Sequence, residues 1–339
     1  MNILLIGAFG FDNMDTGGQP VKSRELYYAL QNDKRVENVS ILETKNWKKH
    51  PFKLLFSFFK KAKKSDLIIM LPAHNGLFVF SFLLCFAKKR FKKKIYYDVI
   101  GGWLVEKAKQ HHSLIKRLKK FDDIWVETSS MKNGLQKLGI QSRVVPNFKS
   151  LKPIAFDEVP DDYTPPLKLC FFARVMKQKG VQIAIDTIIR LNKEGFRYSL
   201  DIYGYIDPLY REEFDNLLLN SKGFISYKGV AKPNESVAIL KNYYLLLFPT
   251  LFYTEGVPGT LVDALFAGVP VVSSKWQNFY DVVDENITGF GYDFNDSNGL
   301  FCILKEMYSN HNKIREMRFE CIKKSSRFTP KNALSLIDL

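Results

Sequence analysis

Residues 253–270 read YTEGVPGTLVDALFAGVP, and this stretch decides the fold class more clearly than any other part of the chain. Its opening is rich in Gly and Pro, which predicts a loop, and the apolar residues that follow predict a short helix over 260–266. Gly268 stands where a helix commonly ends, and the apolar run 269–273 predicts a buried strand. A loop, a helix and a buried strand in succession are typical of an α/β domain with a parallel sheet.

The same stretch carries groups that suit a phosphorylated ligand. The free amides at the start of a helix, here around 259–261, form a natural phosphate site. Glu255 lies in the loop and Asp263 about one turn inside the helix, so we expect both carboxylates to reach one ligand. Two acids at this spacing are a weak signal alone, because many surface helices match it.

Two cations upstream strengthen the interpretation. Residues 167–172 predict a strand, Arg174 follows its carboxyl end, and Lys179 precedes an expected helix over 180–193. Cations at the carboxyl edge of a parallel sheet are placed to bind a diphosphate. The alternative is an exposed cationic loop that binds nothing. A third element, the glycine pair Gly17 and Gly18 after the first expected strand, permits close backbone approach to a phosphate or a sugar.

Short apolar runs alternate with helical stretches along the rest of the chain. We expect strands at 2–7, 39–43, 66–71, 94–99, 123–127 and 142–145, and helices at 21–31, 52–63, 77–87, 113–119 and 130–138. A second series has strands at 167–172, 198–203, 225–228, 245–249 and 269–273, and helices at 180–193, 208–219, 237–242 and 260–266. The sequence therefore predicts an α/β protein with two Rossmann-like, doubly wound domains facing a central cleft. The expected parts are a first domain at 1–148, a linker at 149–166, a second domain at 167–325, and a tail at 326–339 that can cross back to the first domain.

The three glycine-rich or charged elements together resemble the retaining GT-B glycosyltransferases with an E-x7-E motif, the large glycosyl transferase group 1 family. This resemblance covers nearly the whole chain and implies that Glu255 contacts the donor sugar and Asp263 the nucleotide ribose. It implies that Arg174 and Lys179 stabilise the leaving nucleoside diphosphate. The second acid departs from the family pattern, because Asp263 is one methylene shorter than Glu. The other donor contacts implied are Gly17, Gly18, Gly229, Gly256, Val257, Pro258, Gly259, Thr260 and Leu261.

The acceptor side is less well defined. Many relatives carry a His after the middle strands of the first domain, whereas residues 97–103 read YDVIGGW here. Asp98 and His74 are the candidates for this side, and a structural, hydrogen-bonded His74 is an equally good interpretation. No protein nucleophile is identifiable. Retention therefore comes from the resemblance, through a front-face mechanism in which the departing diphosphate helps to deprotonate the acceptor hydroxyl.

We expect neither a metal ion nor another cofactor. The sequence has no D-x-D motif, with which many transferases hold a sugar diphosphate through a divalent metal. Arg174, Lys179 and the helix N-terminus are expected to compensate the charge instead.

The net charge of +15 is concentrated in the first half. Residues 1–150 carry 28 Lys and Arg against 12 Asp and Glu, whereas the remaining residues carry 22 against 23. This asymmetry predicts a polyanionic partner, and the aromatic and lysine clusters at 52–64 and 88–94 favour an anionic membrane surface. The alternative is a set of core phenylalanines beside solvated lysines.

The apolar stretch 67–87 is interrupted by polar and breaking residues from Pro72 to Gly76, so it predicts strand, loop and helix instead of a membrane span. Four scattered cysteines and an opening without a basic signal region predict a cytoplasmic protein, here peripheral on the inner face of the cell membrane. Its expected reaction moves a sugar from a UDP- or GDP-sugar to a lipid-linked glycan acceptor. Rival hypotheses are an epimerase or phosphorylase of the same fold, a silent sugar-nucleotide-binding subunit, and a basic nucleic-acid-binding protein. No recognisable nucleic-acid platform accompanies the charge, so nucleic acid is not an expected partner.

Overall fold

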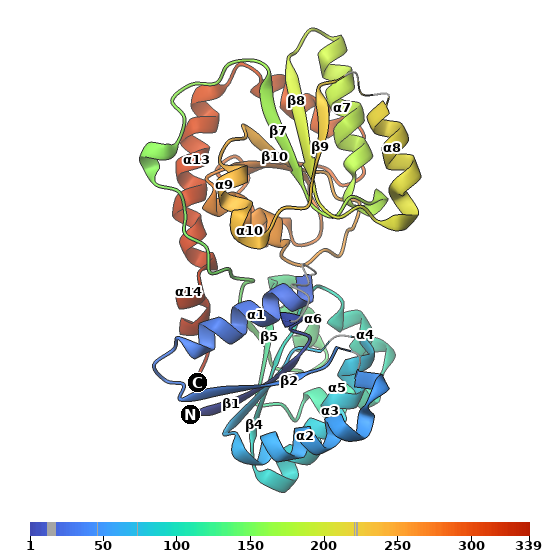
Figure 1. Ribbon diagram of the computed structural model, residues 1–339, viewed down its shortest axis with the longest axis vertical. Coiled ribbons are helices and arrows are strands. Elements are labelled where there is room, and N and C mark those ends of the chain that lie inside the picture. Colours follow the sequence, from blue (N-terminus) through green and yellow to red (C-terminus); the bar gives the residue numbers. More distant parts are fainter. Residues whose placement is uncertain (12–17, 46, 73, 220, 222) are drawn as a thin grey trace. The chain divides into compact units, whose positions relative to one another are not determined.

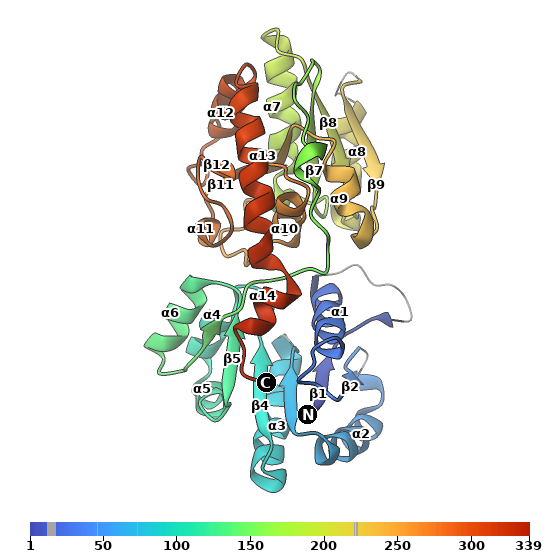
Figure 2. The same cartoon turned by 90° about the vertical axis from the view of Figure 1, so that its left-hand side faces the viewer.

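The computed structural model describes residues 1–11, 18–45, 47–72, 74–219, 221 and 223–339 (Figure 1). The chain divides into two compact units, which are Met1–Ser150 with Phe328–Leu339 and Leu151–Arg327. Both chain ends lie in unit 1 (Figure 2). The stretch 149–166, which we expected to be a linker, is divided. Its part from Leu151 onward belongs to unit 2, because Ile154 and Val159 bury their side chains there beside Ile322.

Unit 1 is built on a parallel sheet with the strand order β2-β1-β3-β4-β5-β6. Its strands are β1 (Asn2–Gly7), β2 (Asn38–Glu43), β3 (Leu67–Met70), β4 (Lys94–Asp98), β5 (Asp123–Val126) and β6 (Arg143–Val144). Its helices are α1 (Gly18–Gln31), α2 (Pro51–Lys64), α3 (His74–Phe91), α4 (Leu104–Gln110), α5 (His112–Leu118), α6 (Ser129–Lys137) and α14 (Pro330–Ser335).

Both faces of this sheet are buried, which explains the continuous apolar runs of its strands. In β1, Leu4 and Ile6 pack into a core that includes side chains from α2 to α6. The alternate residues Ile3 and Leu5 pack on the other face, in a core with side chains of α1 and α14. Unit 1 is therefore a three-layer structure, in which the chain's last helix completes one layer.

Unit 2 has a parallel sheet with the strand order β12-β11-β10-β7-β8-β9. Its strands are β7 (Leu167–Phe172), β8 (Tyr198–Tyr203), β9 (Ile225–Gly229), β10 (Leu245–Phe248), β11 (Val271–Ser274) and β12 (Gly289–Tyr292). Its helices are α7 (Val181–Lys193), α8 (Arg211–Leu219), α9 (Ser236–Leu240), α10 (Gly259–Phe266), α11 (Phe279–Val282), α12 (Gly299–Met307) and α13 (His311–Ser325). Short 3-10 turns span Trp47–Lys49, Phe156–Glu158, Lys177–Lys179, Pro208–Tyr210, Pro233–Glu235 and Ser326–Phe328.

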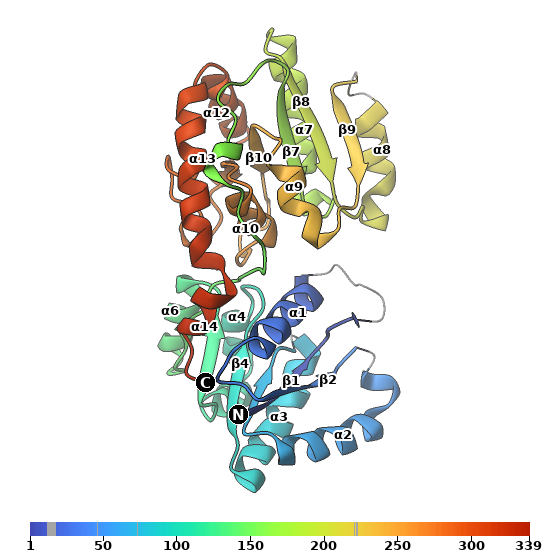
Figure 3. The ribbon, with the colours of Figure 1, turned by 60° about the vertical axis from the view of Figure 1, so that its left-hand side comes forward.

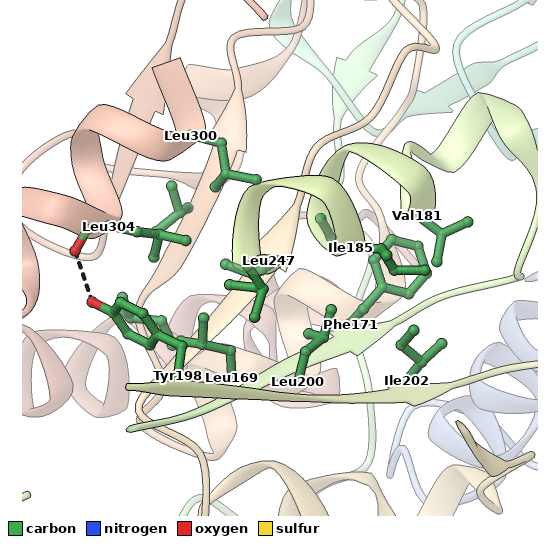
Figure 4. Packing of buried hydrophobic residues seen from close by; sticks show 14 of the residues in the cluster. Leu169, Phe171, Val181, Ile185, Tyr198, Leu200, Ile202, Leu247, Leu300 and Leu304 are labelled. Carbon is green, nitrogen blue, oxygen red and sulfur yellow. Dashed lines mark hydrogen bonds between the residues drawn. The ribbon is translucent and has the colours of Figure 1, made fainter. Parts of the chain in front are cut away.

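The main core of unit 2 lies between its sheet and the layer of α7 and α12. Figure 4 shows strand residues such as Leu169 and Leu200 facing Ile185 of α7 and Leu304 of α12. The phenol of Tyr198 donates a hydrogen bond to the carbonyl of Leu304 at 2.7 Å, which satisfies a buried hydroxyl within this core. Helices α9 and α13 both pack against α10.

The apolar stretch 67–87 is divided between β3 and α3. Among the residues that the structure describes, no helix has the length and apolar character needed to cross a bilayer. The cysteines Cys85, Cys170, Cys302 and Cys321 are all free thiols.

Candidate functional site

The strand order of unit 2 creates a switch point between β7 and β10. These two strands are parallel neighbours, with Leu169 opposite Leu245. From β7 the sheet continues to β8 and β9, whereas from β10 it continues to β11 and β12 on the other side. The loops after β7 (173–180) and after β10 (249–258) therefore leave the same sheet edge in opposite directions. In open α/β sheets, ligands bind at the carboxyl ends of strands at such a point.

The two loops contact each other through their backbones. Gly180, at the end of the β7 loop, has φ of +73°, and a Cβ atom there would lie 1.8 Å from the carbonyl oxygen of Pro249. Beside this approach, the amide of Leu251 donates to the carbonyl of Gln178 at 2.9 Å. Residue 180 must therefore be glycine on two grounds, which are its left-handed backbone and the space left by the neighbouring loop.

Lys179 and Glu255, which the sequence assigned to one site, form an ion pair across these loops. The Lys179 side chain is 21% exposed and the Glu255 side chain 17% exposed. The Lys179 Nζ also lies 5.6 Å from the ring centroid of Phe248, at the end of β10. Each charge thus has a compensating neighbour, while both side chains keep a solvent-facing part with which a ligand can interact.

Residues after β11 hold the Glu255 loop in place. The side-chain amide of Asn278 donates to the Glu255 carbonyl, and the Trp276 indole donates to the Gly256 carbonyl at 3.4 Å. The amide of Gln277 donates to the Tyr253 carbonyl at 3.0 Å. These contacts were not predicted from the sequence. The polar and aromatic residues Trp276, Gln277 and Asn278, which come soon after a buried strand, could have indicated them.

The start of α10 presents polar groups without helix partners. Gly256, Val257 and Pro258 are buried and lead into α10, whose N-cap, Pro258, offers no side-chain bond. The amide of Leu261 donates to the Pro258 carbonyl at 3.0 Å, whereas the amides that come first in a helix, here those of Gly259 and Thr260, have no intrahelical acceptor. Within the part of the chain that the structure describes, the buried Oγ1 of Thr260 also has no hydrogen-bond partner. An anionic ligand at this helix start would satisfy both kinds of group.

The remaining predicted residues of unit 2 differ in exposure. Arg174 is exposed just after β7, and the following Val175 is anchored by a bridge to Ile206. Asp263 is only 3% exposed inside α10, and Leu261 is also buried. Gly229 ends β9 with φ of +84°, and its carbonyl accepts from the Gly204 amide at 2.9 Å. The structure thus pairs Lys179 with Glu255 directly, whereas Arg174 is placed at the same sheet edge without a contact to either.

Two of the predicted residues of unit 1 fall outside the description. Gly17 is among the residues that the structure does not describe, and so is the side chain of His74, the first residue of α3. Gly18 is exposed at the start of α1, and a Cβ atom there would meet nothing within 4 Å.

Asp98 lies in a buried cluster of charges. Lys22 Nζ lies 3.0 Å from Asp98 Oδ1 and 2.9 Å from Glu127 Oε1, and all three side chains are nearly inaccessible. Burial alone would lower the pKa of Lys22, but the two carboxylates outweigh it and raise this pKa to about 12. Burial raises the pKa of Asp98, while Lys22 opposes that shift. Through its pair with Lys22, Asp98 thus links helix α1 to the end of β4. The contacts of Lys22 with Asp98 and Glu127 were not predicted from the sequence.

The amide of Gly101 donates to Glu127 Oε2 at 3.3 Å. The charged cluster therefore also fixes the loop after β4, which contains the glycine pair of the YDVIGGW segment. Among the described residues, no group of three or more His, Cys, Asp or Glu side chains is arranged to hold a metal ion.

Part of the chain is similar in sequence to known glycosyltransferases. Residues 166–310 match the family model described as Glycosyl transferases group 1. Over 147 residues the chain is 27% identical to the amylovoran biosynthesis glycosyltransferase AmsK of Erwinia amylovora, a match that covers 41% of this chain and 35% of the relative. The chain thus spans about a third of the length of that curated relative.

Solved structures match over the whole chain. The Anabaena protein HepE, solved in complex with UDP, has a TM-score of 0.76 at 15% identity, covering 99% of this chain and 98% of that one. The lipopolysaccharide outer core galactosyltransferase WaaB, in its apo form, has a TM-score of 0.69 at 19% identity, covering 99% and 97%. These likenesses establish a GT-B fold. The predicted fold class is confirmed by these structures, and the resemblance to the group 1 glycosyltransferases is confirmed over residues 166–310.

Proposed function

We propose that the protein is a glycosyltransferase that moves a sugar from a UDP- or GDP-sugar to a glycan acceptor. The observation that carries this proposal is the Lys179–Glu255 pair at the switch point of unit 2. Support comes from the match of this region to the group 1 family and from the name of AmsK as a biosynthesis glycosyltransferase. The UDP bound to HepE supports a nucleoside diphosphate as the leaving group.

In the proposed reaction, the bond between the donor sugar and the diphosphate breaks, and the acceptor oxygen bonds to the sugar carbon. The acceptor proton passes to the departing diphosphate. Arg174, Lys179 and the amides at the start of α10 stabilise the negative charge that develops there. We assign no divalent metal to this step, because these groups supply the compensation, and a chelator should leave turnover unchanged.

The two acids have separate proposed roles. Glu255 contacts the transferring sugar, and ligand binding loosens its pair with Lys179, because the diphosphate competes for the ammonium. Asp263 accepts from the ribose hydroxyls. The burial of Asp263 fits a carboxylate that binds the ribose away from water. We also propose that the transferred sugar retains its anomeric configuration.

The acceptor is proposed to be lipid-linked and on the way to a surface polysaccharide. Amylovoran and lipopolysaccharide in the names of the relatives support a polysaccharide product. The positive charge of residues 1–150 supports work at an anionic membrane, on the cytoplasmic face. His74 and Asp98 remain the proposed acceptor-side residues. Because Asp98 is paired with Lys22, we propose that it acts by positioning the loop after β4.

A thermal-shift screen against UDP- and GDP-sugars tests the proposal. A saturating donor should stabilise the native state by about 3 kcal/mol, because ligand at 100 times its Kd adds about that much. Product analysis with the selected donor then separates transfer from epimerisation or phosphorolysis. A chain that no sugar nucleotide stabilises would contradict the proposed function.

A further inference from the structure

Helices α2 and α3 of unit 1 expose phenylalanines that a solvated surface would not favour. The exposed fractions are 85% for Phe52, 74% for Phe56, 64% for Phe82 and 50% for Phe86. On each helix the two exposed rings are four residues apart, so they lie on one side of that helix. Exposed aromatic residues gathered in this way mark an interaction surface.

The two helices form a single surface. They pack against each other in unit 1 (Figure 3). The half-buried ring of Phe59 on α2 contacts Phe86 on α3 edge-on, with the ring centroids 5.7 Å apart. The exposed rings of both helices therefore flank one aromatic contact, and we call them, with the cations beside them, the α2–α3 face.

The same segment holds nearly all of the surplus positive charge. Residues 44–97 contain 14 Lys and Arg but a single acid, Asp66. Exposed cations follow the exposed rings along each helix. On α2, at the end of α3 and just after α3, they are Lys53, Lys60, Lys63, Lys64, Lys89, Arg90, Lys92 and Lys94. The α2–α3 face thus combines apolar rings with a cationic border and no acid on either helix.

We propose that the α2–α3 face docks on an anionic lipid bilayer, with the phenylalanines inserted at the headgroup boundary and the lysines on lipid phosphates. Amphipathic helices with aromatic residues on one side and lysines on the other lie in this way in the membrane interface. Lysine outnumbers arginine in the segment, and the rings are not part of a base-stacking sheet, so the face favours lipid over nucleic acid. This inference rests on the proposed function only in that a lipid-linked acceptor requires access to a membrane.

Vesicle co-sedimentation of the full chain tests the proposal, with phosphatidylglycerol-containing vesicles and pure phosphatidylcholine vesicles in parallel. One variant combines Phe52→Ser, Phe56→Ser and Phe82→Ser, which are exposed enough for the fold to survive. A second combines Lys60→Gln, Lys63→Gln and Lys64→Gln. The matched controls are Leu209→Ser with Leu219→Ser, two exposed apolar residues of unit 2, and Lys34→Gln with Lys132→Gln and Lys137→Gln, which remove the same charge elsewhere on unit 1.

The wild type should pellet with anionic vesicles and not with neutral ones, and its binding should weaken with salt because exposed charges are screened. The ring variant and the lysine variant should each lose at least tenfold in apparent affinity, while both controls bind as the wild type does. Binding of the ring variant at wild-type strength would overturn the proposal. So would a wild type that ignores anionic vesicles but shifts RNA at about 0.15 M salt. A nucleoside diphosphate thermal shift on the same proteins reports separately on the proposed function, which the two variants should leave intact.

Discussion

The ammonium group of Lys179 pairs with the carboxylate of Glu255, although the two residues are 76 positions apart in the chain. The pair joins the loop after β7 to the loop after β10, at the edge where the sheet of unit 2 changes direction. A part-buried pair of this kind keeps each group poised while no ligand is bound. In the proposed reaction, a diphosphate would offer the lysine a doubly charged partner and would free the carboxylate for the sugar.

Removal of the cations should slow the reaction without unfolding the protein. Lys179→Ala and Arg174→Ala should each lower kcat/KM for the donor, because each variant loses about 2–4 kcal/mol of transition-state stabilisation. Lys177→Ala is the control, because this exposed lysine lies in the same 3-10 turn. Steady-state kinetics decide the matter, and near-wild-type values for both variants would remove the two cations from the mechanism.

The two acids should differ in what they affect. Glu255→Gln should reduce turnover more than nucleotide binding, because its carboxylate is assigned to the sugar. Asp263→Ala should also weaken binding of the free nucleoside diphosphate, because its carboxylate is assigned to the ribose. Calorimetry and kinetics on both variants measure the difference. The reverse pattern would exchange the two roles.

Gly180 should tolerate no side chain. Gly180→Ala places a Cβ atom against the Pro249 carbonyl at a backbone angle that disfavours alanine, so it should destabilise unit 2 by more than about 3 kcal/mol. Gly195→Ala is the matched control, since Gly195 has φ of +94° but no atom within 4 Å of the added Cβ. That variant should cost only about 1–2 kcal/mol. Equal losses in urea unfolding would show that the contact with Pro249 is unimportant.

The buried charges of unit 1 should give a pH-dependent defect. Lys22→Met leaves Asp98 and Glu127 without their cation and should cost about 3–5 kcal/mol at neutral pH. Burial already raises the pKa of Asp98, and without Lys22 this folded pKa lies further above the unfolded value, so its contribution is most favourable at low pH and worsens as pH rises. The deficit relative to the wild type should therefore shrink between about pH 8 and pH 5. Adding Asp98→Asn and Glu127→Gln to Lys22→Met should abolish that pH dependence, and a pH-independent deficit in the single variant would contradict this account.

In the wild type the sign reverses, because the group concerned is a cation. The folded pKa of Lys22, about 12, lies above its ordinary value of 10.5. Its contribution to stability is therefore complete below about pH 10.5 and is lost as pH rises through the folded pKa.

Arg318 of α13 should be the most costly arginine of unit 2 to replace. It is fully buried and donates to the carbonyls of Tyr243 and Lys241, each at 2.7 Å. Arg318→Leu leaves both carbonyls without this donor and should lower the free energy of unfolding by about 2–4 kcal/mol. Arg315→Leu, one turn earlier, breaks a pair with the exposed Asp161 and should cost less than about 1 kcal/mol. Denaturant unfolding of both variants checks the contrast, which equal losses would refute.

The strands of both units could be predicted closely where apolar residues form a continuous or an alternating run. The expected bounds 2–7, 167–172 and 198–203 coincide with β1, β7 and β8. Strand β12 was missed because it reads GFGY, and glycine gives no apolar pattern. A Cβ atom at Gly289 would lie 2.6 Å from the Val271 carbonyl, so this strand depends on close backbone approach as well as on the burial of Phe290 and Tyr292. Helices α4, α11, α12, α13 and α14 were also missed.

Residue types at the candidate site could be predicted, but their partners could not. Lys179 and Glu255 were assigned to one ligand, yet their pairing depends on β7 lying next to β10, which no local pattern encodes. The partners of Lys22 are 76 and 105 positions away, and a lysine near a helix start gives no sign that it is buried. The pairing of Asp98 with Lys22 could not be predicted for the same reason.

Calorimetric titration of UDP and GDP tests the central claim most directly, with the wild type, the Arg174→Ala, Lys179→Ala double variant and the Lys177→Ala control. The account predicts that the wild type and the control bind at least one of the two nucleotides equally well. The double variant should bind it about 100-fold more weakly, because two charge-assisted contacts of about 1.5 kcal/mol each are lost. Equal affinity of the wild type and the double variant, or no binding of either nucleotide to the wild type, would contradict the claim that this edge of unit 2 holds the donor.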